Sequence, residues 1–273
     1  MIKICCIFFK DMIWFHVKCL DVIFIRILIK GYLKNISENE IVNFECKGIK
    51  NKNKVTYVDN DVRAMALGES WFGITKDISN FVTLNISNGI GAGIIINNKP
   101  YYGVDFSAGE IGHIVVEGDG DKCNCGNYGC LETVASNNNI TKKAIKLIKQ
   151  GTNSVLKELK ADINQLTIED ISEAAKLEDE LAISIIKEAA RYIGIAITNL
   201  INILNPTSIV VVGEIFENTF YAIETLNEIV KNRGMKLSSE NVRIIKSMLG
   251  RDAAVVGATT LVIQEIFNGM SIN

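Results

Sequence analysis

The sequence predicts an α/β fold with mixed sheets, because short apolar runs of strand length alternate with longer segments of helical spacing. With 273 residues, 48% of them hydrophobic, the chain is long enough to bury a core in one large domain or two modest ones. The strand-like runs are VTYV at 55–58, NFVTLNIS at 80–87, IIIN at 94–97, TSIVVVG at 207–213 and VRIIKS at 242–247.

The first helix is expected directly after the strand at 55–58. Asn60 and Asp61 precede the run VRAMALGESWFG, and Asp61 has a residue type that commonly caps a helix N-terminus. Further along, the Gly-rich stretch NGIGAG follows a β-rich run, and Asn97-Asn98 has the chemistry of a tight turn into KPYYG.

The second half of the chain is rich in helical patterns. Its longest segment, ELAISIIKEAARYIGIAITNLINIL, repeats apolar residues at helical spacing. We expect helices at 138–150, 167–175, 177–204, about 217–232 and 253–267.

The first 33 residues are apolar, but charged side chains interrupt every run below the roughly 18 residues that a spanning helix needs. No small-residue cleavage site follows an apolar core, so we expect neither a membrane segment nor a signal peptide. The interrupting residues are Lys10, Asp11, Lys18, Asp21, Arg26 and Lys30.

The net charge of −2 argues against contact with a nucleic-acid backbone by this chain. The odd number of cysteines, seven, indicates a reducing cytoplasm rather than a disulfide framework. Cys5, Cys6, Cys19 and Cys46 lack the spacing of metal ligands and are interpreted as free, buried thiols.

One short segment, HIVVEGDGDKCNCGNYGCLE, has the spacing of a Cys3His metal site: His113, Cys123, Cys125 and Cys130. Thiolates and a neutral imidazole suit tetrahedral Zn²⁺, and four protein ligands make such a site structural. Two alternatives are loop thiols beside an unrelated histidine, and a zinc finger that binds nucleic acid. The finger fits poorly, because the segment is acidic.

Two carboxylates flank this segment, Glu110 before His113 and Glu132 after Cys130. A rigid metal-bound loop at 113–130, the zinc knuckle, would hold these two hydrogen-bond acceptors in a fixed position from which they can bind a polyol.

Four motifs together resemble the ROK family of repressors, open reading frames and sugar kinases. They are VDNDVRAMALGE, NGIGAGI, SAGEIGH and CNCGNYGCLE, and they agree with the family in order and spacing. The tail SMLGRDAAVVGATTLVIQEIF resembles the xylose-repressor-type regulators in particular. The resemblance runs from about residue 55 to the C-terminus.

The resemblance implies an actin-like, ribonuclease H-like sugar kinase fold of two lobes, here with an incomplete first lobe. One lobe would comprise 1–77 with the helix at 252–273, and the other 78–251 with the zinc knuckle. It further implies that Asn60, Asp61, Glu110, His113 and Glu132 contact a sugar, and that His113 also binds zinc. In the kinases of the family, the residue at Asp61 is the general base.

The chain departs from the kinases in its phosphate-handling parts. No Asp-x-Gly-Gly-Thr loop precedes Asn60, where only Gly31 and Gly48 occur. Asn88 stands at the Thr position of the second loop, and Gly213-Glu214 replaces a double glycine. The remnant of that second loop is Asn88, Gly89, Gly91 and Gly93.

These departures predict a cytoplasmic, non-catalytic, sugar-sensing domain of a regulator of carbohydrate or xylose metabolism, with structural zinc. We expect a small sugar as ligand, a homo-oligomer such as a dimer, and no DNA contact, since no winged helix-turn-helix is recognised. The alternatives are an ATP- and Mg²⁺-dependent glucokinase-like enzyme using Asp61, and a non-functional remnant whose residues 1–50 no longer encode a lobe.

Overall fold

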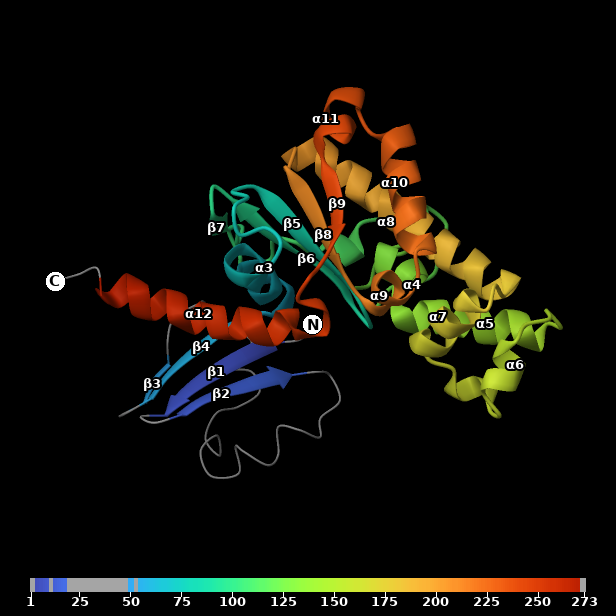
Figure 1. The fold of residues 1–273 in the computed structure, drawn as a ribbon, viewed down its shortest axis with the longest axis horizontal. Helices are drawn as coiled ribbons and strands as arrows, with labels where there is room; N and C mark the ends of the chain where they lie inside the picture. Colours follow the sequence, from blue (N-terminus) through green and yellow to red (C-terminus); the bar gives the residue numbers. More distant parts are fainter. Residues whose placement is uncertain (1–2, 10–11, 19–48, 52–53, 271–273) are drawn as a thin grey trace. The chain divides into compact units, whose positions relative to one another are not determined.

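The computed structural model describes residues 3–9, 12–18, 49–51 and 54–270, with side chains from residue 59 to residue 264 (Figure 1). The chain forms two compact units. The first contains residues 1–79, 93–108 and 251–273, and the second contains 80–92 and 109–250.

The first unit contains an antiparallel sheet of four strands, in the order β2-β1-β4-β3. Strand β1 pairs with β2 so that Ile7 faces Trp14, and with β4 so that Cys5 faces Val58. The predicted strand at 55–58 is confirmed as part of β4, whereas the sequence indicated no strand before residue 55. The strands are β1 (Lys3–Phe9), β2 (Met12–Lys18), β3 (Ile49–Asn51) and β4 (Lys54–Asn60).

Part of the expectation about the first fifty residues lies outside the described residues. Cys19, Cys46 and most of the segment between β2 and β3 belong to that part. Strands β1 and β2 show that residues 3–9 and 12–18 join the sheet of the first unit.

Two helices of the first unit pack at very short range, α3 (Asp61–Phe72) and α12 (Ala253–Met270). A methyl group placed on Gly257 would lie 1.9 Å from the carbonyl oxygen of Ala64, and one on Gly68 would lie 2.9 Å from the amide nitrogen of Gly257. Two facing glycines therefore let the helix backbones approach this closely. The packing fixes α3, which carries two of the predicted site residues at its start.

The second sheet has five strands in the order β7-β6-β5-β8-β9, and it is mixed, as the sequence predicts. Strands β5, β8 and β9 run parallel, and β6 and β7 form an antiparallel hairpin. Every residue of β5 and β8 is buried, as expected for central strands covered on both faces. The strands are β5 (Phe81–Ile86), β6 (Ile90–Ile96), β7 (Lys99–Pro100), β8 (Ser208–Val212) and β9 (Arg243–Lys246).

The helices of the second unit gather around α8, which packs against α4, α5, α7 and, along much of its length, α10 (Figure 1). A methyl group on Gly194 of α8 would lie 2.8 Å from Ile229 of α10, so this contact is also tight. The helices are α4 (Leu131–Ala135), α5 (Asn137–Lys149), α6 (Leu156–Leu159), α7 (Ile168–Lys176), α8 (Glu180–Leu204), α9 (Glu214–Asn218), α10 (Tyr221–Arg233) and α11 (Lys236–Asn241).

Asp61 lies next to the cap of α3, as expected. The cap itself is Asn60, whose side chain accepts the free backbone N–H groups of the first turn. Two other predicted boundaries differ from the structure. The helix expected at about 217–232 is two helices, α9 and α10. The helix expected from residue 177 begins at Glu180, because Asp179 caps it.

The turn expected at Asn97-Asn98 is confirmed. Both residues have positive φ, 51° and 62°, and they join Ile96 to its partner Lys99. Among the described residues, no helix is both long enough and apolar enough to cross a membrane.

Candidate functional site

Backbone hydrogen bonds fold the knuckle at 113–130 into tight turns. The Cys123 N–H donates to Asn127, and the Gly126 N–H donates back to Cys123. Gly129 has φ +65°, and a methyl group there would lie 1.6 Å from the carbonyl oxygen of Glu117. Only glycine permits this approach, so the segment CNCGNYGC is shaped by its backbone rather than by an apolar core.

These turns bring the four predicted metal ligands together. One ligand atom from each of His113, Cys123, Cys125 and Cys130 lies within 4.8 Å of the other three. The Nδ1 atom of His113 is 3.6 Å from the Cys123 sulfur, and the sulfurs of Cys125 and Cys130 are 3.7 Å apart.

The cluster fits a tetrahedral zinc ion. Zn–S bonds of about 2.3 Å and Zn–N bonds of about 2.0 Å place two sulfurs about 3.8 Å apart, and a sulfur and a nitrogen about 3.5 Å apart. The two distances in the cluster lie close to these edges. The residues present can therefore hold a metal ion through Nδ1 of His113 and three thiolates.

The thiols differ in how readily they ionise. Burial raises the pKa of Cys130 to about 12, and the neighbouring thiols Cys125 and Cys123 add to the effect. The backbone hydrogen bond from Asn127 lowers the pKa of the exposed Cys125. A metal that binds here must displace the Cys130 proton, so binding is expected to weaken as the pH falls.

The second ring nitrogen of His113 faces a carboxylate. Its Nε2 atom lies 4.0 Å from Oε2 of Glu110, and both side chains are more than a third exposed. With Nδ1 directed at the thiols, metal binding would fix the tautomer and leave Nε2 protonated and able to donate. His113 and Glu110 thus offer a donor and an acceptor side by side.

Glu132 lies in the first turn of α4, two residues after Cys130. Its Oε2 atom accepts a hydrogen bond from the Ile90 N–H at 3.2 Å. One carboxylate oxygen is therefore used to hold the start of β6, and a carboxylate at a helix N-terminus is also favoured by the helix dipole. The hydrogen bond to Ile90 thus fixes the Glu132 side chain next to the knuckle, within the second unit.

Asn60 and Asp61 belong to the first unit, at the start of α3. Oδ1 of Asn60 accepts from the N–H groups of Val62 and Arg63 at 3.0 and 3.1 Å. Because capping uses this oxygen, the group that Asn60 retains for a ligand is its NH₂ donor. Asp61 is 5% exposed and supplies a carboxylate next to that donor.

The residues of the predicted phosphate-loop remnant fall into two settings. Asn88 and Gly89 form the turn between β5 and β6, whereas Gly91 and Gly93 lie within β6. A methyl group on Gly93 would lie 2.4 Å from the carbonyl oxygen of Val62, so this glycine is needed for the packing of β6 on α3.

Glu214 follows Gly213 directly after β8. Its Oε2 atom accepts a hydrogen bond from Nδ2 of Asn137, at the start of α5, at 2.8 Å. Asn137 in turn donates its backbone N–H to Ser87, in the turn after β5. The Glu214 carboxylate is thereby held beside the carboxyl ends of β5 and β8, which run parallel.

A cavity of about 390 Å³ lies in the second unit, and none of the predicted site residues lines it. It is lined by Ala175, Lys176, Glu178, Glu217, Asn218, Thr219, Phe220, Tyr221 and Lys246.

The two sheets, together with the cluster of predicted metal-ligating side chains, define a protein of the actin-like, ribonuclease H-like class that includes sugar kinases. Within this class, the chain belongs to the ROK family, whose family model matches residues 31–265.

Two curated regulators are similar to this chain. The DNA-binding transcriptional dual regulator NagC of Escherichia coli K12 is 36% identical over 218 residues, which cover 80% of this chain and 52% of NagC. The xylose repressor of Caldicellulosiruptor bescii is 35% identical over 222 residues, covering 79% and 54%. The chain spans about half the length of these relatives.

Two solved structures are also similar. A ROK family transcriptional regulator, a homolog of the E. coli MLC protein, has a TM-score of 0.71 and 34% identity, covering 77% of this chain and 52% of that one. A ROK family glucokinase from Streptomyces griseus, in complex with glucose and AMPPNP, has a TM-score of 0.71 and 29% identity, covering 76% and 68%.

Several polar residues near the site were not predicted from the sequence. Asp59 and Arg63 are spaced i, i+4 around the start of α3, a spacing that typically brings opposite charges together. The contacts of Glu117 with Tyr192 and of Asn137 with Glu214 join residues far apart in the chain, and no local pattern indicates them.

Proposed function

We propose that this chain is the sugar-sensing, effector-binding part of a ROK transcriptional regulator of carbohydrate metabolism, without kinase activity. Asn60, Asp61, Glu110, His113 and Glu132 would bind the sugar. A structural zinc ion on His113, Cys123, Cys125 and Cys130 would hold the knuckle and orient the His113 ring.

The observation that carries this proposal is the carboxylate of Glu214. The kinases that the sequence resembles have a second glycine at this position, where the nucleotide binds. Here a carboxylate fixed by Asn137 stands in its place, and it would repel the phosphates of a nucleotide. The similarity to NagC and to a xylose repressor supports the same assignment.

The polar groups of the predicted sugar-binding residues suit a polyol. Asn60 retains donors and Asp61 offers acceptors, while His113 and Glu110 again pair a donor with an acceptor. A sugar hydroxyl both donates and accepts, so such pairs can bind it in a fixed orientation. Xylose and N-acetylglucosamine are the first sugars to test, because similar regulators include the xylose repressor and an N-acetylglucosamine repressor of Escherichia coli O6:H1 that is 36% identical over 218 residues.

The test is a thermal-shift screen of the zinc-loaded protein against xylose, glucose, N-acetylglucosamine and N-acetylmannosamine, each with and without Mg-ATP. A ligand that binds only the folded state raises the midpoint. A shift with one sugar that ATP leaves unchanged is the expected result. Sugar phosphate in the reaction would refute the non-catalytic assignment, and no shift with any sugar would refute the sensor.

The second candidate function is an ATP-dependent sugar kinase. Asp61 favours it, because this residue is buried at the start of α3, where the kinases that the sequence resembles carry their general base. The glucokinase of similar structure points the same way. A coupled assay for ADP production with glucose or xylose separates the two functions directly.

We also propose that the protein is a cytoplasmic homodimer whose small-molecule partner is the sugar. The dimer is expected from the family resemblance. The buried face of α8 does not supply its interface, because other helices of the same unit occupy that face. Light scattering at several protein concentrations tests the dimer, for which twice the chain mass of 30.1 kDa is expected.

A further inference from the structure

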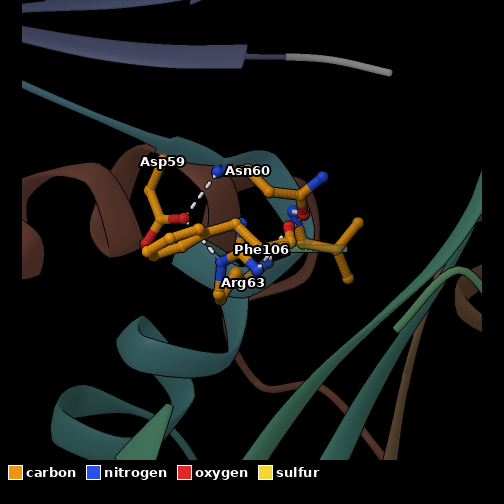
Figure 2. Close-up of polar contacts among 5 residues, drawn as sticks. Asp59, Asn60, Arg63 and Phe106 are labelled. Carbon is orange, nitrogen blue, oxygen red and sulfur yellow. Dashed lines mark hydrogen bonds and ion pairs between the residues drawn. The ribbon is translucent and has the colours of Figure 1, made fainter. Parts of the chain in front are cut away.

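A buried ion pair lies at the start of α3. Nε of Arg63 is 2.6 Å from Oδ1 of Asp59, and the two residues are 7% and 6% exposed (Figure 2). The same Asp59 oxygen accepts the Asn60 N–H at 2.7 Å. Asn60, in turn, caps the backbone N–H of Arg63. Asp59, Asn60 and Arg63 therefore form a closed ring of hydrogen bonds around the first turn.

Arg63 also holds a second segment of the first unit. Its Nη1 atom donates to the carbonyl oxygen of Phe106 at 3.3 Å, as Figure 2 shows. The guanidinium lies 4.8 Å from the ring centroid of Tyr102, and the rings of Tyr102 and Phe106 are 5.5 Å apart. Phe106 has φ +57°, a conformation that a non-glycine residue keeps only when its surroundings hold it.

Stability alone is a poor explanation for this arrangement. Taking a guanidinium and a carboxylate out of water costs about as much as their attraction returns, and apolar side chains of similar size often serve equally well. Arginine, however, has a planar fork of donors that can bind two acceptors in fixed directions at once. Here the two acceptors are Asp59 and the Phe106 carbonyl.

We propose that Arg63 is a positioning residue for sugar recognition. It fixes Asn60 and Asp61 at the start of α3, and the segment 101–107, in a single arrangement before the ligand arrives. This inference rests on the proposed sugar-binding function. Its physical basis is preorganisation: a ligand that meets ordered partners loses less affinity to the ordering of side chains and loops.

The test compares Arg63→Met and Arg63→Lys with the wild type, using calorimetric titration with N-acetylglucosamine and xylose. Arg63→Met is expected to weaken the Kd by at least about tenfold. Arg63→Lys keeps the charge next to Asp59 but lacks the second donor direction, so an intermediate Kd is expected. Hydrogen exchange at 101–107 should be faster in both variants.

Lys160→Met is the matched control. It removes an ion pair with Asp170 in the second unit, at 3.1 Å, and should leave the Kd and the exchange at 101–107 unchanged. Zinc content should be the same in all variants, because the knuckle belongs to the other unit.

The outcomes separate the inference from the function on which it rests. If the wild type binds a sugar and Arg63→Met binds it with the same Kd, the inference is overturned and the function stands. If the wild type binds none of the tested sugars, the proposed function fails and the inference fails with it. If Arg63→Met does not fold, Arg63→Lys decides: an unchanged Kd overturns the inference.

Discussion

The hydroxyl of Tyr192, on α8, donates a hydrogen bond to Oε1 of Glu117, in the knuckle at 113–130, across 3.0 Å. The residues are 75 positions apart in the chain. Burial raises the pKa of Tyr192, and the bond to Glu117 raises it further, so the phenol remains a donor at neutral pH. This bond ties the knuckle to the longest helix of the second unit.

The first prediction concerns this bond. Tyr192→Phe should lower the free energy of unfolding by about 1 kcal/mol, because it leaves the Glu117 carboxylate without its donor. Zinc should also be removed faster by a chelator, since the knuckle loses an anchor. Tyr128→Phe is the control: Tyr128 lies in the same knuckle, and its side chain is 54% exposed. Equal zinc release from both variants would contradict the anchoring role.

The second prediction concerns the metal. Cys130→Ser should reduce bound zinc from about one per chain to a small fraction, because a tetrahedral site loses one of four ligands. The melting temperature should fall as well, since the binding free energy of a structural zinc contributes to folding. Elemental analysis and thermal unfolding measure the two effects.

Asn124→Ser is the matched control for the metal site, because Asn124 is exposed and lies between two ligands without being one. It should retain zinc and stability. A Cys130→Ser protein with full zinc content would show that the cluster is not the zinc site.

The central sheet and most helices of the second unit were predictable because their patterns are local. Strand β8 is an apolar run after its first residue, β5 is rich in strand-forming residues, and α8 repeats apolar residues at helical spacing. The clustering of the four candidate metal ligands was predictable for the same reason, since all four lie within eighteen residues of the chain and the glycines between them permit the turns.

What could not be predicted depends on partners distant in sequence. Strands β1 and β2 lie in an apolar stretch whose periodicity favours no element, and their pairing with β4 is a tertiary property. Arg63 finds the Phe106 carbonyl 43 residues away, and Glu214 finds Asn137 77 residues away. Choosing Asn60 instead of Asp61 as the cap needed the backbone geometry, because both residue types cap helices well.

The third prediction separates the two roles of Asn60. Its oxygen caps α3, and its NH₂ group is the donor left for a ligand. Asn60→Asp keeps a capping oxygen, so the stability should change little, but it replaces the donor with a charged acceptor and should weaken sugar binding at least tenfold. Asn60→Ala should lower stability by about 1 kcal/mol through loss of the cap.

Thermal unfolding and sugar titration of both Asn60 variants check this prediction. Asp61→Asn serves as the comparison, because it keeps the size of the side chain but removes the charge, and it should weaken sugar binding without loss of the cap. Sugar affinity that survives in Asn60→Asp would remove Asn60 from the site.

The fourth prediction concerns pH. Burial raises the pKa of Asp59 above its usual value, while the charge and hydrogen bond of Arg63 act in the opposite direction. In Arg63→Met these opposing effects are lost, so the pKa of Asp59 should rise further. A raised pKa means that the folded protein binds the proton more tightly than the unfolded chain, so this group favours folding at low pH and loses that contribution as the pH rises through the folded-state pKa.

The destabilisation of Arg63→Met relative to the wild type should therefore be larger at pH 8 than at pH 5, as measured by urea unfolding at both values. Lys160→Met should behave differently from Arg63→Met, because the pKa of its partner Asp170 is lowered. Burial raises this pKa, but hydrogen bonds with Thr167 and Lys160 lower it by more. A lowered pKa contributes stability above the unfolded value, near 3.8, so the loss in Lys160→Met should be the same at pH 5 and pH 8. An equal loss at both pH values in Arg63→Met would show that Asp59 does not titrate there as its burial requires.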